Sequence, residues 1–177
     1  LHDVVLPASV TDLGTRAFES CIKLFKITMP GVDYIGIESF AHCENLKEIA
    51  LPKTLGKIRK AAFADCKALE EINIPSHLKI IDKSAFRNSG LKSLNIEISD
   101  GGKCLVYDKA FASCKHLESV YLNKNVKIVE RMAFAGCTSL KTIEFENPSL
   151  TGLIGETGLI GEINATMLIG CTSLEKI

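Results

Sequence analysis

One phrase recurs seven times along this chain of 177 residues, and this recurrence constrains the fold more than any other feature. The phrase is Leu-x-x-Ile-x-Leu-Pro, then a short polar link, then an apolar residue followed by x-x-x-Ala-Phe-x-x-Cys. Its clearest copy is residues 46–66, LKEIALPKTLGKIRKAAFADC. Self-similarity at a fixed period of this size indicates a solenoid, in which each repeat forms one coil and touches only its neighbours.

Three columns of residues keep the same register along the chain. The leading leucines are spaced by 23, 22, 23, 22, 26, 23 and 34 residues, and they are Leu1, Leu24, Leu46, Leu69, Leu91, Leu117, Leu140 and Leu174. The second column is Phe18, Phe40, Phe63, Phe86, Phe111 and Phe134, with Leu168 in the last unit. The third is Cys21, Cys43, Cys66, Ser89, Cys114, Cys137 and Cys171. We therefore predict one solenoid over residues 1–177, with seven repeats of about 23 residues and the start of an eighth.

Two units are longer than the others, each for a local reason. One gains about three residues at 99–103, SDGGK, where Asp-Gly-Gly is turn chemistry. The other contains TGLIGE at 151–156 and again at 157–162, and removing both copies restores the spacing to 22. The duplication predicts an extruded loop. Its Leu and Ile residues either contact a partner or pack against the solenoid.

Each repeat predicts a short strand followed by a return path. Ile49 and Leu51 are two residues apart and share one face of a strand that Pro52, lacking an N–H, ends. Repetition places such strands in a parallel sheet on one face of the coil. The segment with the next apolar pair, Leu55 and Ile58, is predicted to run back over the core, in some units as a second short strand. Residues 62–63, Ala-Phe, predict a helical or 3₁₀ turn at the corner, with the Phe rings stacked as a ladder.

These motifs resemble the BspA-like, or treponemal-type, leucine-rich repeats, over the whole of residues 1–177. The departures are single positions: Glu97, Asn123 and Glu146 replace Pro, and Ser89 replaces Cys. The resemblance implies a right-handed, leucine-rich-repeat-like coil that is mainly β. It also implies an extracellular or cell-surface location, and adhesion to protein partners such as host or extracellular matrix proteins.

Composition excludes several classes of partner. The 21 basic and 21 acidic residues cancel, which argues against nucleic acid and against a polybasic membrane surface. No stretch is long and apolar enough to insert into a membrane, and no signal peptide begins the chain. Repeats occupy both ends without a polar capping unit, so we expect these residues to be a fragment of a longer protein.

The seven cysteines are the most chemically suggestive residues. Six lie in one column about 23 residues apart, which excludes the close pairing of a zinc site. Adjacent members would be about 4.8 Å apart with parallel side chains, a poor geometry for disulfides, so we predict buried free thiols instead. Cys104 lies outside the column beside residues 99–103, and we expect it to be the most accessible thiol.

No motif for catalysis is present, so we predict a non-enzymatic protein without metal or cofactor. The four histidines, His2, His42, His77 and His116, occupy different repeat positions and would not converge. Nucleophile-elbow, phosphate-loop and zinc-protease motifs are absent.

Outward positions of the predicted strands remain as the candidate binding surface. One such column is Thr28, Ala50, Asn73, Asn95, Tyr121 and Glu144, and beside it runs Lys26, Glu48, Glu71, Ser93, Ser119 and Thr142. A third alternates in sign from Lys47 to Glu175 and supports register and solubility. We predict a protein-binding site at Asn73, Asn95, Tyr121 and Glu144. Tyr121 is either an interface residue or simply an exposed strand residue. The alternative to a binding or adhesion module is a passive spacer in a larger surface protein.

Overall fold

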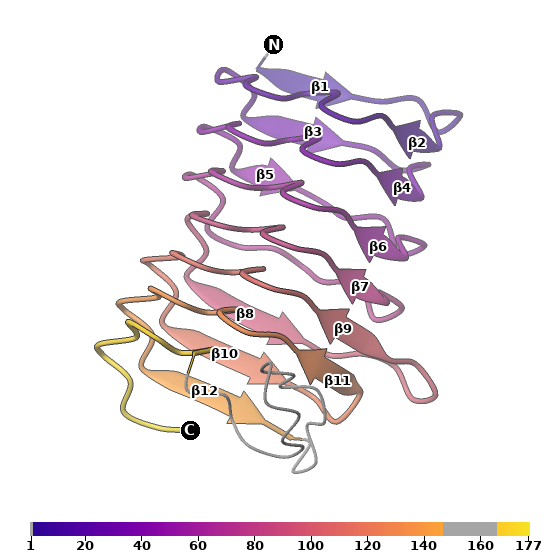
Figure 1. Ribbon diagram of the computed structural model, residues 1–177. Helices are drawn as coiled ribbons and strands as arrows, with labels where there is room; N and C mark the ends of the chain where they lie inside the picture. Colours follow the sequence, from indigo (N-terminus) through magenta and orange to yellow (C-terminus); the bar gives the residue numbers. More distant parts are fainter. Residues whose placement is uncertain (1, 147–165) are drawn as a thin grey trace.

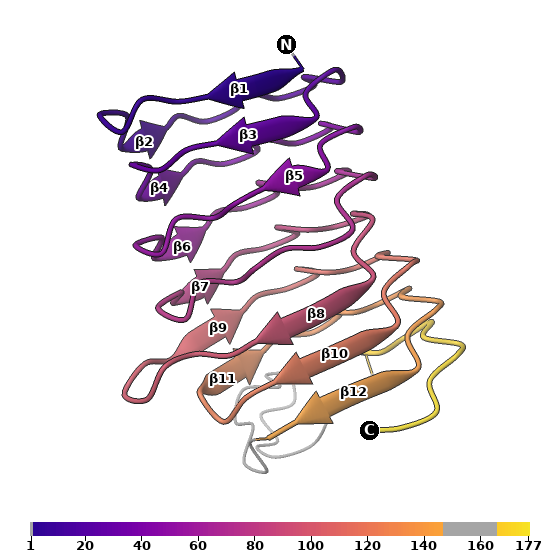
Figure 2. The ribbon, with the colours of Figure 1, turned by 180° about the vertical axis from the view of Figure 1, so that it is seen from behind.

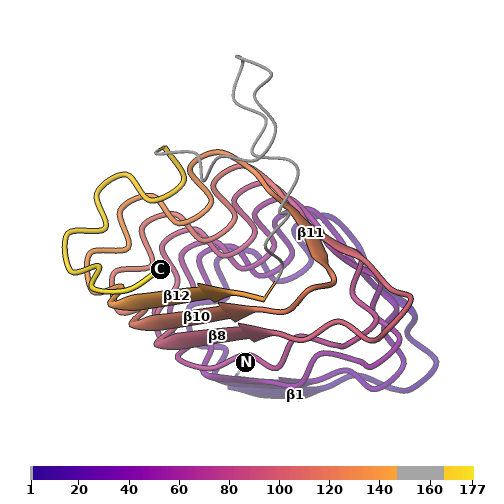
Figure 3. The same ribbon diagram turned by 90° about the horizontal axis from the view of Figure 1, so that it is seen from below.

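The computed structural model describes residues 2–146 and 166–177, and it shows a right-handed coil whose turns stack along one axis (Figures 1 and 3). All strand pairs are parallel, and no described residue is in a helix. The strands are β1 Asp3–Val5, β2 Asp12–Leu13, β3 Lys26–Thr28, β4 Tyr34–Ile35, β5 Glu48–Ile49, β6 Lys57–Ile58, β7 Ile80–Ile81, β8 Ser93–Ile96, β9 Cys104–Val106, β10 Ser119–Leu122, β11 Val126–Val129 and β12 Thr142–Phe145. The predicted solenoid fold, with parallel strands on one face of the coil, is confirmed.

The Leu-x-x-Ile-x-Leu segments form one face of the coil (Figure 2). They make two three-stranded sheets, β1-β3-β5 and β8-β10-β12. In β8 the side chains of Leu94 and Ile96 are buried while Ser93 and Asn95 are exposed, as the alternation predicts. The single sheet that the repeat predicts is therefore interrupted, because the coil of residues 69–75 contributes no strand to this face.

Strand length on this face follows the residue at the proline position. Asn123 donates its N–H to the carbonyl of Ile96 at 3.1 Å. Glu146 donates likewise to Leu122 at 2.9 Å. Proline has no N–H, so coils that carry it cannot make this bond. β8, β10 and β12 accordingly have four residues each, and their coils are those with Glu97, Asn123 and Glu146 in place of proline.

The return path forms a second sheet, which confirms the second short strand predicted after the Leu-Pro segment. Its order is β11-β9-β7-β6-β4-β2, without interruption. The inward residues of this sheet, such as Ile35, Ile58 and Ile81, are fully buried. The core thus lies between the two strand faces and the turns that close each coil (Figure 3).

The third side of the coil is built of turns and not of helix. Ala61 and Asp65 have φ of 52° and 62°, and equivalent left-handed residues recur in the other coils. Two left-handed residues four positions apart keep reversing the local curvature, so no helix propagates. The N–H groups of Ala61, Phe63 and Asp65 instead donate to carbonyls of the next coil at 3.0, 2.7 and 2.8 Å. The corner is therefore another line of hydrogen bonds between coils.

The phenylalanine column forms the predicted ladder of stacked rings. From Phe18 to Phe134, adjacent ring centroids are 5.2–5.4 Å apart and the planes are within 8° of parallel. The five rings from Phe40 to Phe134 are fully buried. Each of the four inner rings, Phe40 to Phe111, thus packs against the equivalent ring of both neighbouring coils, which makes the ladder a continuous apolar contact along the axis.

All seven cysteines are free, and the column has a regular hydrogen-bonding role. The Cys66 thiol donates to the Phe40 carbonyl of the preceding coil at 3.2 Å. The same contact to the preceding phenylalanine, at 3.0–3.2 Å, is made by Cys43, Cys114, Cys137 and Cys171. A small apolar side chain with a weak donor fits this buried position.

The expectation that Cys104 is the most accessible thiol is wrong. Cys104 begins β9, where residues 104 and 106 face the core and Leu105 faces outward. Its side chain is fully buried, and burial raises the pKa of the Cys104 thiol to about 12. Only Cys21 and Cys171 are partly exposed. The tandem TGLIGE segment, residues 151–162, lies outside the described residues.

The order in which the thiols react should follow this burial. We expect iodoacetamide at pH 8 to modify Cys21 and Cys171 first, because buried thiols are both shielded and protonated. Cys104 should react at the slow rate of Cys43. Peptide mass spectrometry along a time course measures these rates, with denatured protein as the control for equal intrinsic reactivity. Fast modification of Cys104 in the native state would contradict the orientation of β9.

Candidate functional site

Three of the four predicted site residues lie side by side on the strand face. Asn95 of β8 is the direct partner of Tyr121 on β10, which in turn is the partner of Glu144 on β12. Their outward side chains form one row across three coils, as the spacing predicts. Asn73 is exposed in the preceding coil, but that coil has no strand on this face. The row is therefore continuous only from Asn95 onward.

The strand face is interrupted where Asn73 lies. Among the described residues, none accepts a hydrogen bond from the backbone N–H of Glu71, Ile72, Asn73 or Ile74. On either side the ladder is regular, with Glu48 bonded to the Phe25 carbonyl at 3.0 Å and Glu118 to the Lys92 carbonyl at 2.8 Å. Unpaired backbone groups at a sheet position are ready to pair with another polypeptide.

A groove of about 570 Å³ lies over this interruption. Its lining includes outward polar residues of several coils and Ile27 of the inward column, together with two further residues of that column, Ile49 and Ile72. These two are only partly buried, whereas their equivalents Ile27 and Leu94 are 1% and 3% exposed. The groove thus combines apolar surface, free backbone donors and polar side chains. The repeat pattern assigns Ile49 and Ile72 to the core, so sequence reasoning missed them as surface residues.

Charges along the face are mostly paired between coils. Lys26 and Glu48, both lining the groove, are 2.7 Å apart. In the alternating column, Lys92 is 2.8 Å from Glu70, which raises the pKa of Lys92 and lowers that of Glu70 through their hydrogen bond and mutual attraction. These exposed pairs are individually weak. They support register between coils, as the alternation predicts.

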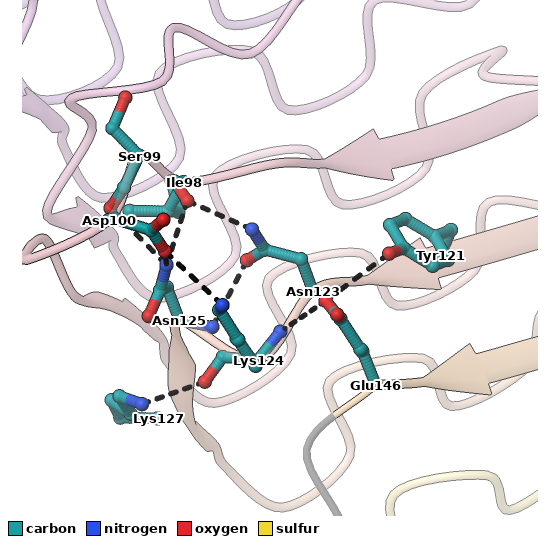
Figure 4. Close-up of polar contacts among 9 residues, drawn as sticks. All are labelled: Ile98, Ser99, Asp100, Tyr121, Asn123, Lys124, Asn125, Lys127 and Glu146. Atoms are coloured by element: carbon teal, nitrogen blue, oxygen red, sulfur yellow. Dashed lines mark hydrogen bonds and ion pairs between the residues drawn. The ribbon is translucent and has the colours of Figure 1, made fainter.

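Tyr121 of β10 is held by Glu146, the residue that follows β12 in the next coil (Figure 4). Its hydroxyl donates to Glu146 Oε2 at 3.3 Å, and the same oxygen accepts the Lys124 N–H at 2.9 Å. Desolvation and the Glu146 carboxylate raise the pKa of Tyr121, so the hydroxyl stays a neutral donor. The ring is half-buried. Tyr121 therefore presents a fixed aromatic surface beside Asn95.

The described residues contain no cluster of three or more His, Cys, Asp or Glu side chains arranged to hold a metal ion. Within the same part of the chain, no helix of membrane-spanning length and hydrophobicity occurs.

The repeats match a known family model along nearly the whole chain. The model of the BspA type leucine rich repeat region matches in six copies, over residues 1–101 and 105–177. The chain belongs to this family. Residues 102–104, the gap between the matches, overlap the SDGGK expansion at 99–103 of this BspA-type chain.

Solved structures of leucine-rich repeat proteins share the coil. The leucine-rich repeat protein of Treponema pallidum is 31% identical, with a TM-score of 0.73, over 82% of this chain and 71% of that one. A leucine-rich repeat protein of Bacteroides ovatus is 27% identical, with a TM-score of 0.65, over 84% and 46%. A leucine-rich cell surface protein of Faecalibacterium prausnitzii is 27% identical, with a TM-score of 0.56, over 83% and 32%. No functionally curated protein matches. This BspA-type chain thus spans about half the length of the Bacteroides relative.

Proposed function

We propose that these coils act together as a non-enzymatic protein-binding module of a secreted or cell-surface protein. The binding surface is the strand face from the groove at Asn73 to Tyr121 and Glu144. One observation carries the proposal: the strand face is interrupted at a single coil, which leaves free N–H donors and partly exposed isoleucines in a groove. A passive spacer has no reason to differ between coils, because each coil then needs only to stack on its neighbours.

The chemistry of this face suits a protein partner. An extended polypeptide supplies carbonyl acceptors for the N–H groups of residues 71–74 and apolar side chains for Ile49 and Ile72. The adjacent row contributes Asn95, Tyr121 and Glu144, of which tyrosine is the type enriched at binding hot spots. The cell-surface protein of Faecalibacterium prausnitzii supports a surface location. Adhesion to host or extracellular matrix proteins is the role that this location favours.

Binding should fail when the groove is blocked. A partner is first sought by surface plasmon resonance, in which the protein is passed over a panel of immobilised, purified extracellular matrix proteins. We expect Asn73→Arg to weaken the affinity for a bound partner at least tenfold, because a long charged side chain fills the groove. Tyr121→Ala should lower affinity by a similar factor. Because the chain has no net charge, affinity should change little with salt.

The matched control is Thr138→Arg, which adds the same charge at an exposed turn away from the strand face. Circular dichroism and thermal unfolding confirm that all variants remain folded. If Asn73→Arg and Tyr121→Ala both bind like the wild type, the strand face is not the binding surface. If no panel member binds, the adhesion role fails and the spacer function becomes the better account.

A further inference from the structure

A second cavity lies on a different side of the coil, beside the SDGGK expansion. Its volume is about 590 Å³, within the range of sites that bind small molecules. Three successive coils contribute to it: Lys57 comes from the first, Lys79 and Ile80 from the second, and Lys103 and Leu105 from the third. It does not overlap the groove at Asn73. Nothing in the proposed protein-binding role uses it.

The expansion forms one wall of this cavity in a fixed conformation. Gly101 has φ of 80°, which favours glycine. A Cβ on Gly102 would lie 2.9 Å from Cγ2 of Ile98, too close for a larger residue without movement. The turn is closed by the Gly102 N–H to the Ser99 carbonyl at 3.0 Å. Beneath it, the buried Asn125 side chain donates to the carbonyls of Ile98 and Ser99 at 3.0 and 3.2 Å (Figure 4).

The charges around the cavity are unbalanced. Lys57, Lys79 and Lys103 are all exposed, and none is within 4.0 Å of a carboxylate in the described part of the chain. Asp100 is the one acidic residue of the lining, and its Oδ1 is already engaged by Lys124 at 3.4 Å and by the Asn125 amide at 3.4 Å (Figure 4). A chain of zero net charge thus concentrates three unpaired positive charges at one cavity.

The wall between these lysines is apolar. Ile80 and Leu105 are direct partners in the second sheet, and both are partly exposed. The next residues along the same strands, Ile81 and Val106, are fully buried. Two adjacent aliphatic side chains therefore line the cavity beneath a rim of ammonium groups. A fully polar anion would leave this apolar surface uncovered, and a neutral apolar molecule would leave the lysines without counter-charge.

We propose that this cavity binds a small amphiphilic anion. The carboxylate or sulfate head lies among Lys57, Lys79 and Lys103, and the aliphatic or aromatic body covers Ile80 and Leu105. The site is independent of the strand face, so either one functions without the other. Because the lysines are exposed, the attraction is strongest at low ionic strength.

Two anions and one neutral compound with the same tail test the proposal. Sodium octanoate, sodium octyl sulfate and octyl glucoside are titrated into ¹⁵N-labelled protein below their micelle-forming concentrations, in low salt. We expect saturable amide shifts at residues 99–103 and at Ile80 with one or both anions. The neutral glucoside should bind at least tenfold more weakly. Octanoate binding more tightly than octyl sulfate identifies a carboxylate ligand, and the reverse order identifies a sulfate ligand.

A triple variant, with Lys57, Lys79 and Lys103 each replaced by Gln, should lose at least tenfold in affinity for the preferred anion. The matched control replaces Lys23, Lys60 and Lys115 by Gln, which lowers net charge equally at exposed positions outside the cavity. An equal loss in both variants would mean that net charge alone attracts the anion and would overturn the site. So would equal binding of the glucoside, or the absence of saturable shifts at residues 99–103.

Discussion

Replacing Phe63 by Ala is expected to lower the free energy of unfolding by about 3–5 kcal/mol, as for other fully buried phenylalanines. Phe63 is completely buried, and its ring stacks on Phe40 and Phe86 with centroids 5.2 Å away on both sides. The substitution removes the apolar contact, leaves a cavity and interrupts the ladder in the middle of the solenoid. Each coil is stabilised by its neighbours, so the loss affects three coils together.

Phe25→Ala is the matched control for this experiment. Phe25 also stacks on a neighbouring ring, His2 at 5.1 Å, but it is only partly buried and lies outside the ladder. We expect it to cost about 1 kcal/mol, near the average for a single substitution. Chemical denaturation followed by circular dichroism gives both values. A loss below about 1 kcal/mol for Phe63→Ala would contradict the ladder as a principal source of stability.

Raising the pH from 9 to 10 is expected to destabilise the fold by about 1 kcal/mol for each strongly buried thiol. Burial raises the pKa of Cys43 and of Cys104 to about 12, above their ordinary range. Below about pH 7 both thiols are protonated in the folded and the unfolded chain, so stability is at its full value. As the pH rises through the ordinary pKa of cysteine, the unfolded chain loses these protons first. The unfolded state is then favoured increasingly until the folded pKa is reached.

In the double variant Cys43→Ala/Cys104→Ala, the loss of unfolding free energy between pH 9 and pH 10 should be about 2 kcal/mol smaller than in the wild type. Urea unfolding at pH 8, 9 and 10 measures this difference, and an upper limit of pH 10 restricts the titration of lysines. Val106→Ala is the control, since it removes buried apolar contact beside Cys104 but keeps both thiols. It should lower stability equally at every pH. An unchanged slope in the double variant would show that the two thiols ionise while folded.

The repeat pattern predicted the coil well because the same few residues recur at every turn. Phe63 and its equivalents could be assigned to one buried stack from spacing alone. So could the exposed row of Asn95, Tyr121 and Glu144, because side chains alternate along a strand. The corner was harder to predict, since Ala and Phe suit a helical turn locally. The left-handed residues Ala61 and Asp65 prevent a helix there, and they allow hydrogen bonds to the next coil.

Cys104 shows why the expanded unit was predicted incorrectly. Its neighbours at 99–103 form a loop, and proximity in sequence suggested exposure. The strand β9 begins at Cys104 itself, and pairing with the adjacent coil turns this side chain inward. The register between neighbouring coils decides whether a residue at the boundary of an insertion belongs to the loop or to the strand. The local sequence does not specify that register.

The sequence by itself determined the period and the recurrent buried columns, because apolar residues that return at the same position of every coil are buried when the coils stack. Only the tertiary structure decided where the strand face is interrupted and where the lysine-rimmed cavity lies. Both depend on the displacement of one coil against the next. Lys57 is in register with Ile80 and not with Lys79, so the three lysines share no repeat position. These lysines come together because the coils stack. The repeat pattern of the sequence does not specify the offset between one coil and the next.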